Sequence, residues 1–222
     1  MIENKLRFFF KKQIWHLGGG ILLFYIATQL IDLENNTNTL LGASAKNWFI
    51  FSMLIPLIHQ CYIWICWRAE LCWKTITNTI GFKLCVTIFF IVGLLRFSCI
   101  GLCIVDYGSL YKPELMAWIL GIIIFIPGAY TIYSVKKYFG FLRAAGADHF
   151  FSEYKDMPFE KRGIFKWSSN AMYLFGIAIF FSFAVSTGSK AGFIFAIYSY
   201  ICIWLHYFCT EKEDLKIIYG NN

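Results

Sequence analysis

The hydrophobic positions of this chain gather into six long stretches, separated by polar connections of which one is much longer than the others. A hydrocarbon core of ~30 Å needs about 20 apolar residues per helix, and the six stretches come near that length. The expected spans are residues 14–31, 47–67, 84–105, 115–135, 171–185 and 191–209. The pattern therefore predicts an all-α, polytopic transmembrane helix bundle of about six spans.

The last two stretches are joined by only a few residues around Thr187, Gly188 and Ser189. Helices linked so closely must be antiparallel neighbours, which predicts a C-terminal helical hairpin. We expect residues 1–135 to form four spans, and residues 136–222 to form a segment at the cytoplasmic interface followed by the hairpin. Basic residues precede the first stretch and no small-residue cleavage site follows it, so we expect a retained span.

The lysines and arginines indicate how the bundle is oriented. Of the 20, 16 fall near the two chain ends or in the connections after the second and fourth stretches, and the other three connections carry one each. The positive-inside rule then places both termini in the cytoplasm. The remaining one, Arg96, lies within the third stretch, where we expect a structural partner such as Asp106. His59 and Gln60 are expected to form interhelical hydrogen bonds.

Composition agrees with a membrane protein and narrows the classes of function. The chain is 59% hydrophobic, with a mean hydropathy of +0.59 and only 15% charged residues, which is too apolar for a soluble domain. The net charge of +7 is expected to face anionic lipid at the bilayer surface, not nucleic acid. Eight cysteines without a CxxC pair and four histidines without metal-binding spacing predict neither a disulfide framework nor a metal site.

Two polar groups that are distant in the sequence are expected to meet at the cytoplasmic end of the hairpin. Tyr173 precedes the connection at Gly188 by nearly as many residues as His206 follows it. At 1.5 Å rise per residue, the two side chains reach a comparable depth. Asn170 and Glu211 fall just beyond them, so a polar cluster is predicted at this end of the bundle.

The last stretch ends in three acidic residues, Glu211, Glu213 and Asp214. The spacing of His206, Thr210 and Glu213 puts these three on one helix face. The helix dipole disfavours carboxylates at a helix C-terminus, so some positive group should compensate them. A cationic ligand would do so, and a solvated helix end neutralised by neighbouring lysines is the alternative.

Two motifs add a resemblance to a known group of enzymes. The sequences RGIFKWSSNAMYLFG (162–176) and HYFCTEKEDLKIIYG (206–220) resemble the C-terminal signature of the isoprenylcysteine carboxyl methyltransferase and phosphatidylethanolamine N-methyltransferase superfamily. The run from Asn170 to Tyr173 is similar to the N-P-M-Y variant of the phospholipid methyltransferase branch. The Arg-His pair of the carboxyl methyltransferases is absent, and Lys212 stands in place of the second glutamate of the other motif.

The resemblance implies a membrane enzyme that uses S-adenosyl-L-methionine, whose sulfonium and ammonium groups suit carboxylate partners. The residues it implies for cofactor binding are Asn170, Met172, Tyr173, Gly176, His206, Glu211 and Glu213. Asn170, His149 and Glu211 would take part in catalysis, with His149 or a glutamate receiving a proton from the acceptor. Lys137 and Arg143 would hold a lipid phosphate.

The expected acceptor is a membrane lipid, first of all the amine of a phospholipid, reached at the cytoplasmic face. An isoprenylcysteine carboxylate or another lipophilic acceptor is the alternative within the superfamily. Two other classes stay open, a sterol-reductase-like enzyme that binds NADPH and a non-catalytic membrane scaffold. Few arginines lie in the last two stretches, which argues against a cofactor with several phosphates.

Overall fold

The computed structural model describes residues 2–220 of the chain. Its α-helices are α1 (Ile2–Phe9), α2 (Gln13–Gln29), α3 (Ala45–Trp73), α4 (Thr75–Asn78), α5 (Gly81–Leu95), α6 (Ser98–Val105), α7 (Leu115–Ser134), α8 (Phe141–Ala144), α9 (Ser152–Lys155), α10 (Ala171–Phe175), α11 (Ala178–Thr187), α12 (Lys190–His206) and α13 (Lys212–Tyr219). Two π-helical turns, η1 (Val135–Phe139) and η4 (Tyr207–Glu211), continue α7 and α12, and two 3-10 turns are η2 (Ala147–His149) and η3 (Gly163–Lys166). A two-residue hairpin pairs β1 (Thr39–Leu40) with β2 (Ala43–Ser44) in antiparallel register.

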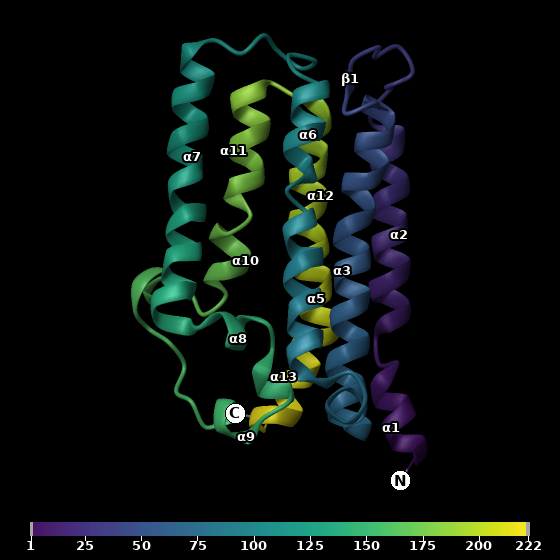
Figure 1. The fold of residues 1–222 in the computed structure, drawn as a ribbon, viewed down its shortest axis with the longest axis vertical. Coiled ribbons are helices and arrows are strands. Elements are labelled where there is room, and N and C mark those ends of the chain that lie inside the picture. Colours follow the sequence, from purple (N-terminus) through teal and green to yellow (C-terminus); the bar gives the residue numbers. More distant parts are fainter. Residues whose placement is uncertain (1, 221–222) are drawn as a thin grey trace.

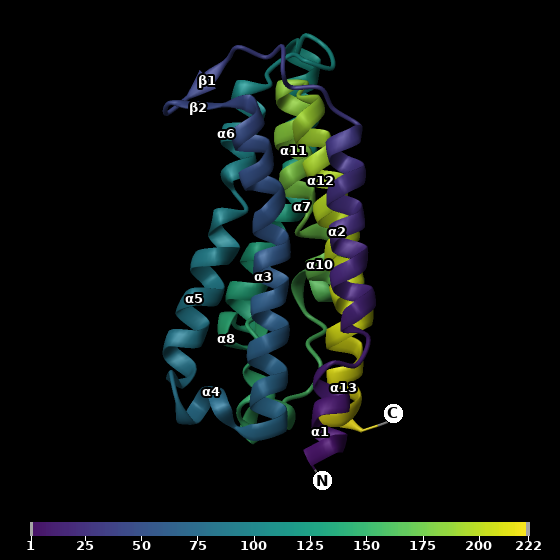
Figure 2. The same cartoon turned by 90° about the vertical axis from the view of Figure 1, so that its right-hand side faces the viewer.

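The long helices stand side by side as an up-and-down bundle, with both chain ends at the same end of the molecule (Figure 1). Helices α2, α3 and α12 pack against one another along the bundle, and α1 packs against α3 at the end where the chain begins (Figure 2). The β hairpin and the α11–α12 connection lie at the opposite end (Figures 1 and 2). The all-α bundle predicted from the sequence is confirmed, and so is its C-terminal hairpin of α11 and α12.

Within the described residues, four helices are long and apolar enough to cross a membrane, namely Ala45–Trp73, Gly81–Val105, Leu115–Phe139 and Lys190–Tyr219. The other two expected spans are shorter. The apolar stretch Ala171–Thr187 and helix Gln13–Gln29 both fall below 18 residues, the latter with 17. Helical segments are thus present at all six expected places. Four of them have the length and hydropathy of a full membrane span.

Two of the predicted spans are interrupted. The helix of the third span breaks between Leu95 and Ser98, so that Arg96 caps α5, and the helix of the fifth breaks at Gly176 and Ile177 between α10 and α11. Helix α12 begins at a capping residue, Ser189, whose hydroxyl accepts a hydrogen bond from the Gly192 backbone N–H at 2.9 Å.

The main apolar core lies in the half of the bundle farther from the chain ends. It joins α2, the first part of α3, α6, α11 and the first part of α12 around fully buried Met53, Leu102 and Phe195. The half nearer the chain ends instead buries polar side chains, which are Gln13, His16, Gln60, Arg68, Glu70, Asp148, His149, His206, Thr210, Glu213 and Asp214. Buried polar groups in a membrane protein mark functional candidates, so the site is sought in this half.

The long polar segment between α7 and α10 folds back over this end of the bundle as short helical turns (Figure 1). Its residues from Ala145 to Phe150 are buried. The Trp67 indole N–H of α3 donates a hydrogen bond to the Ala145 carbonyl at 3.2 Å, and the Trp67 ring stacks on His149 at 4.2 Å between centroids. The segment is therefore packed onto the bundle, as its interleaved aromatic and charged residues predict.

Candidate active site

Tyr173 of α10 and Glu211 of the η4 turn meet at the end of the bundle where the two chain ends lie. The Tyr173 hydroxyl donates a hydrogen bond to Glu211 Oε2, although the residues are 38 positions apart in the sequence. The rings of Trp204 and Tyr207 pack on Tyr173, with centroids 6.1 and 5.9 Å away. The predicted convergence of the two polar groups is thus present in the fold.

The predicted common face of His206, Thr210 and Glu213 is also present, but it turns away from the Tyr173–Glu211 pair. It lies against the N-terminal segment. The His206 ring lies 5.1 Å from the His16 ring, centroid to centroid, and the Thr210 hydroxyl accepts a hydrogen bond from Gln13 Nε2 at 3.1 Å. The Glu213 carboxylate pairs with the ammonium groups of Lys11 (2.7 Å) and Lys12 (2.8 Å). The expected helix C-terminus is not there, because Glu213 lies in the first turn of α13 and the helix continues to Tyr219, but the two lysines still neutralise its carboxylate. Glu213 therefore anchors the N-terminal segment.

The third acid of the cluster, Asp214, forms an ion pair inside the bundle. Its Oδ1 lies 2.9 Å from Nε of Arg68 on α3, and both side chains are fully buried. The Arg68 guanidinium also donates to the carbonyls of Lys11 (2.7 Å) and Cys209 (2.9 Å). Breaking a buried pair of this kind costs about 3–5 kcal/mol. Arg68 consequently fixes the η4 turn, and Glu211 with it, against α3 and the N-terminal segment.

A polar cavity of about 280 Å³ opens beside the Tyr173–Glu211 pair. Its walls come from α3, the segment after α7, α10, η4 and α13. The lining residues are Trp67, Phe139, Arg143, Ala144, Gly146, Asp148, His149, Phe159, Ser169, Asn170, Met172, Tyr173, Tyr207, Glu211, Leu215 and Tyr219. Two carboxylates and six aromatic rings in one small cavity suit a ligand that carries both positive charge and a flat ring.

Asp148 and His149 form a charged pair on one wall of the polar cavity. Burial by itself would lower the pKa of His149, but a hydrogen bond to the Asp148 carboxylate (2.9 Å from Nδ1) and the Asp214 carboxylate 3.6 Å from Nε2 raise it to about 9. Burial would raise the pKa of Asp148, and the hydrogen bonds from His149 and from the Tyr219 hydroxyl lower it below its usual value. His149 is therefore protonated at neutral pH, which disfavours the role of proton acceptor that we expected for it.

A second cavity, also of about 280 Å³, lies deeper in the bundle and is mostly apolar. It is lined by His59, Gln60, Ile63, Trp67, Phe89, Phe90, Arg96, Thr131, Ile132, Val135, Phe141, Ala144, Met172, Tyr173, Ile203 and His206. Phe89 and Phe90 come from α5, whereas Ile132 comes from α7 and Val135 from the η1 turn that continues it. Ile132 and Phe141 are about half exposed on the lipid-facing surface, so the cavity reaches that surface between α5 and α7.

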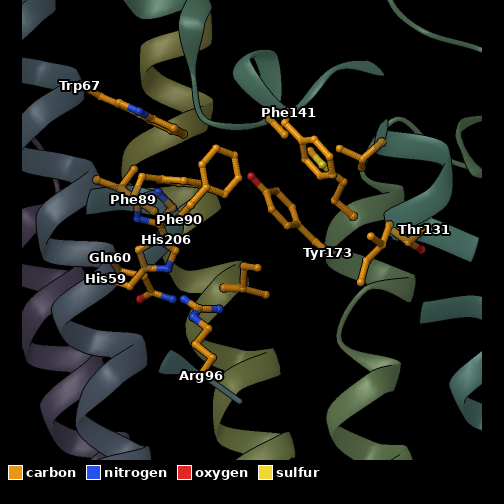
Figure 3. A pocket seen from close by; sticks show the side chains of 16 residues that line it. His59, Gln60, Trp67, Phe89, Phe90, Arg96, Thr131, Phe141, Tyr173 and His206 are labelled. Atoms are coloured by element: carbon orange, nitrogen blue, oxygen red, sulfur yellow. The ribbon is translucent and has the colours of Figure 1, made fainter. Parts of the chain in front are cut away.

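Trp67, Met172 and Tyr173 line both cavities and form the wall between them. In the apolar cavity, the Tyr173 ring lies across from Phe89 and Phe90, with its hydroxyl pointing toward Trp67 (Figure 3). The Arg96 guanidinium reaches in from the other end, on the side of Gln60 and His59 (Figure 3). A polar and an apolar compartment thus share one tyrosine.

Residues 116–222 match the family model described as phospholipid methyltransferase. The match covers the C-terminal part of the chain, just under half of its length, and makes that part similar to this family. No match is found among curated proteins or among solved structures. The match and the four apolar helices together support an integral membrane protein. The match begins at the start of α7, so α1 to α6 lie outside it.

The methyltransferase motif residues fall into three groups in the structure. Asn170, Met172, Tyr173 and Glu211 line the polar cavity, together with His149 and Arg143. His206 instead lines the apolar cavity. Gly176, Glu213 and Lys137 line neither cavity: Gly176 lies at the α10–α11 break, Glu213 pairs with lysines, and Lys137 bonds the Tyr133 hydroxyl at 2.8 Å.

The candidate site also contains residues that sequence reasoning did not select. Asp148 has no motif around it, and Trp67 could not be distinguished from the other seven tryptophans. The expectation for Arg96 was wrong, because Asp106 accepts hydrogen bonds from Ser109, Ser189 and the Ala191 backbone instead. The expectation for Gln60 is confirmed by its hydrogen bond to His16 at 3.3 Å, whereas neither ring nitrogen of His59 has a partner among the described residues.

Proposed function

We propose that this protein is a methyltransferase that uses S-adenosyl-L-methionine to methylate the amine of a membrane phospholipid. The observation that carries the proposal is the pair of adjoining cavities that share Tyr173, one with carboxylates and the other apolar and open toward lipid. The cofactor is charged and soluble in water, whereas the acceptor is soluble in lipid. An enzyme that transfers a group between them therefore needs two such compartments that adjoin.

The residues of the polar cavity fit the proposed cofactor. Glu211 and Asp148 offer carboxylates for an ammonium and a sulfonium group. The rings of Phe139, Phe159 and Tyr207 offer faces for an adenine. The volume of about 280 Å³ lies near the lower end of the ~300–1,000 Å³ typical of ligand pockets, and the exposed Phe159 stands at its rim.

The bound cofactor would supply a methyl group on a sulfonium, an already activated electrophile. The protein then has to align the acceptor, exclude water and remove one proton from the acceptor ammonium. Trp67, Ala144 and Met172 line both compartments beside Tyr173, so the methyl group would pass to the amine at this junction. The Tyr173 hydroxyl can take the proton from the ammonium as it passes its own proton to Glu211 Oε2. The proton then leaves through the polar cavity, and the amine keeps the electron pair that attacks.

A binding titration tests the cofactor part of the proposal. Purified protein should bind S-adenosylhomocysteine and should not bind NADPH. Glu211→Gln should weaken S-adenosylhomocysteine binding by about 10- to 100-fold, the equivalent of one charge-assisted hydrogen bond. Glu153→Gln is the matched control, because this glutamate is exposed and lies outside both cavities. Binding of NADPH instead would identify a reductase, and binding of neither compound would indicate a scaffold.

A transfer assay tests the acceptor. Labelled cofactor is incubated with the protein and a panel that contains phosphatidylethanolamine, its monomethyl and dimethyl derivatives, and an isoprenylcysteine analogue. We expect label in the phosphatidylethanolamine series. If label appears only in the isoprenylcysteine analogue, the acceptor is a carboxylate and not an amine. The proposal for the cofactor site would be unaffected by that result.

A further inference from the structure

The deep end of the apolar cavity holds polar groups that have no partner. Arg96, His59 and Gln60 are 9%, 6% and 2% exposed, and all three line the cavity. Arg96 Nε, both ring nitrogens of His59 and Gln60 Nε2 lack a hydrogen-bond partner among the described residues. Groups of this kind are normally satisfied when they are buried, so their state calls for an explanation.

The local fold presents these groups to the cavity. Arg96 caps α5 where the helix breaks before α6, and His59 and Gln60 are consecutive residues of α3. The Arg96 guanidinium points into the cavity from below, beside Gln60 (Figure 3). No carboxylate pairs with Arg96 in residues 2–220, because Glu211, Glu213 and Asp214 have the partners described above and Asp106 binds Ser109 and Ser189.

A buried guanidinium without a counter-ion is costly in a low-dielectric interior. The cost is removed if a ligand brings negative charge into the cavity. Arg96 and the Gln60 amide offer only donors, since the Gln60 oxygen is already bonded to His16. His59 can donate as well. A cluster of donors around one cation selects an oxyanion, such as a phosphate or a carboxylate.

We propose that Arg96, with Gln60 and His59, binds the phosphodiester group of the lipid acceptor inside the apolar cavity. This inference rests on the proposed function, and it adds the group by which the acceptor is recognised. The phosphate would lie at the Arg96 end and the amine at the Tyr173 end, with the acyl chains leaving between α5 and α7. That order agrees with a lipid of the leaflet at the polar cavity, whose amine is farther from the bilayer centre than its phosphate.

The proposal assigns acceptor recognition to the part of the chain outside the family match. Arg96, His59 and Gln60 all precede residue 116, where the match begins. The matched part carries Tyr173, Glu211 and every lining residue of the polar cavity except Trp67. Cofactor binding and acceptor selection are therefore separable by mutation.

The experiment measures lipid binding without catalysis, by the thermal stabilisation of purified protein in detergent. The three probes are a short-chain phosphatidylethanolamine, an alkylamine of matched chain length without phosphate, and inorganic phosphate. We expect the phospholipid to stabilise the wild-type protein and Arg96→Met to bind it about 10- to 100-fold more weakly. The alkylamine should bind both proteins equally. Inorganic phosphate should have no effect, because it cannot enter an apolar cavity from the lipid side.

Two further variants separate binding from folding. Arg96→Lys keeps the charge but not the bidentate geometry, so its affinity for the phospholipid should lie between those of the wild type and Arg96→Met. Lys83→Met removes an exposed cation from the same helix and should change nothing. Without lipid, Arg96→Met should melt at the wild-type temperature or above, since it removes an unpaired buried charge.

Three results would overturn the proposal: Arg96→Met melting below the wild type with unchanged phospholipid binding, equal loss of alkylamine and phospholipid binding, or binding of inorganic phosphate as strong as that of the lipid. The last result would identify a site for free phosphate. Failure of the proposed function looks different, because S-adenosylhomocysteine would then not bind while the lipid titration stays intact. In an active enzyme, Arg96→Met should raise the KM for phosphatidylethanolamine and leave its kcat within about threefold.

Discussion

At the residue scale, the decisive feature is that some buried ionisable side chains have an oppositely charged partner within the protein and others do not. Asp214 and Glu213 bind cations of the protein itself, whereas within residues 2–220 the one hydrogen-bond partner of the Glu211 carboxylate is the neutral hydroxyl of Tyr173. A carboxylate without a cation is expensive at membrane depth unless a ligand completes it. The same argument applies to Arg96, a buried cation in the apolar cavity on the other side of Tyr173. There the proposed lipid phosphate would supply the missing negative charge.

Tyr173→Phe tests the proton path directly. The change removes one hydroxyl from the wall between the cavities and leaves the ring in place, so S-adenosylhomocysteine should bind within about threefold of wild type. Methyl transfer should fall by about 10²- to 10⁴-fold, the range of a general acid or base. Single-turnover transfer measured against pH gives the comparison, with Tyr200→Phe on α12 as a control outside both cavities. An unchanged rate in the Phe variant would remove Tyr173 from the chemistry.

His149 predicts how stability depends on pH. Its pKa is raised from an ordinary 6.5 to about 9 by Asp148 and Asp214, with Arg68 on the far side of Asp214. The stabilisation is therefore fully present below about pH 6.5 and is lost as the pH rises through about 9. The melting temperature of the wild type should exceed that of His149→Gln by several degrees at pH 6, and the gap should close by pH 10. A gap that widens with pH would show that the histidine is neutral in the folded protein.

At the element scale, the long helices and the hairpin could be predicted from the sequence, whereas the breaks within two helices could not, for a physical reason. Apolar length located every long helix, and the short Thr187–Ser189 connection fixed the hairpin. The breaks after Leu95 and at Gly176 were not predicted, because an uninterrupted apolar run carries no signal for an interruption in lipid. The folded segment after α7 was anticipated as interfacial, but its contact with Trp67 depends on a pairing across 78 residues that periodicity cannot reveal.

Gly146→Ala tests whether that contact shapes the site. Gly146 has a φ of +82°, and a Cβ there would lie 2.4 Å from the Trp67 ring. Gly140 has φ +90° and ψ 133°, another conformation that disfavours a side chain, but it has open space around it, so Gly140→Ala carries backbone strain of about 1–3 kcal/mol without a collision. We expect Gly146→Ala to melt lower than Gly140→Ala and to bind S-adenosylhomocysteine at least 10-fold more weakly. Equal behaviour of the two variants would mean that Trp67 can move without affecting the polar cavity.

At the scale of the whole molecule, the family-matched C-terminal part does not form the site alone. Arg68 and Trp67 of α3 hold η4 and one wall of the polar cavity, while α3 and α5 supply most of the polar groups of the apolar cavity. The sequence alone could identify the C-terminal part of the site, because its two motifs lie close together along the chain. The contribution of α3 was out of reach, since the Arg68–Asp214 pair joins positions 146 residues apart.

The arrangement of the whole chain also carries a prediction about sidedness. Both chain ends and the folded segment after α7 lie at one end of the bundle, with the β hairpin and the α11–α12 connection at the other (Figure 1). Because 16 of the 20 lysines and arginines belong to the first end, the positive-inside rule places that end, and the polar cavity with it, in the cytoplasm. In sealed vesicles with the cytoplasmic face inside, epitope tags at either terminus should be protected from protease, and a tag at Gly42 of the β hairpin should be cut. Permeabilised vesicles, in which all three tags should be cut, provide the control. Protection of the Gly42 tag with cleavage of both terminal tags would invert the molecule and put the cofactor cavity on the wrong side of the membrane for a cytoplasmic methyl donor.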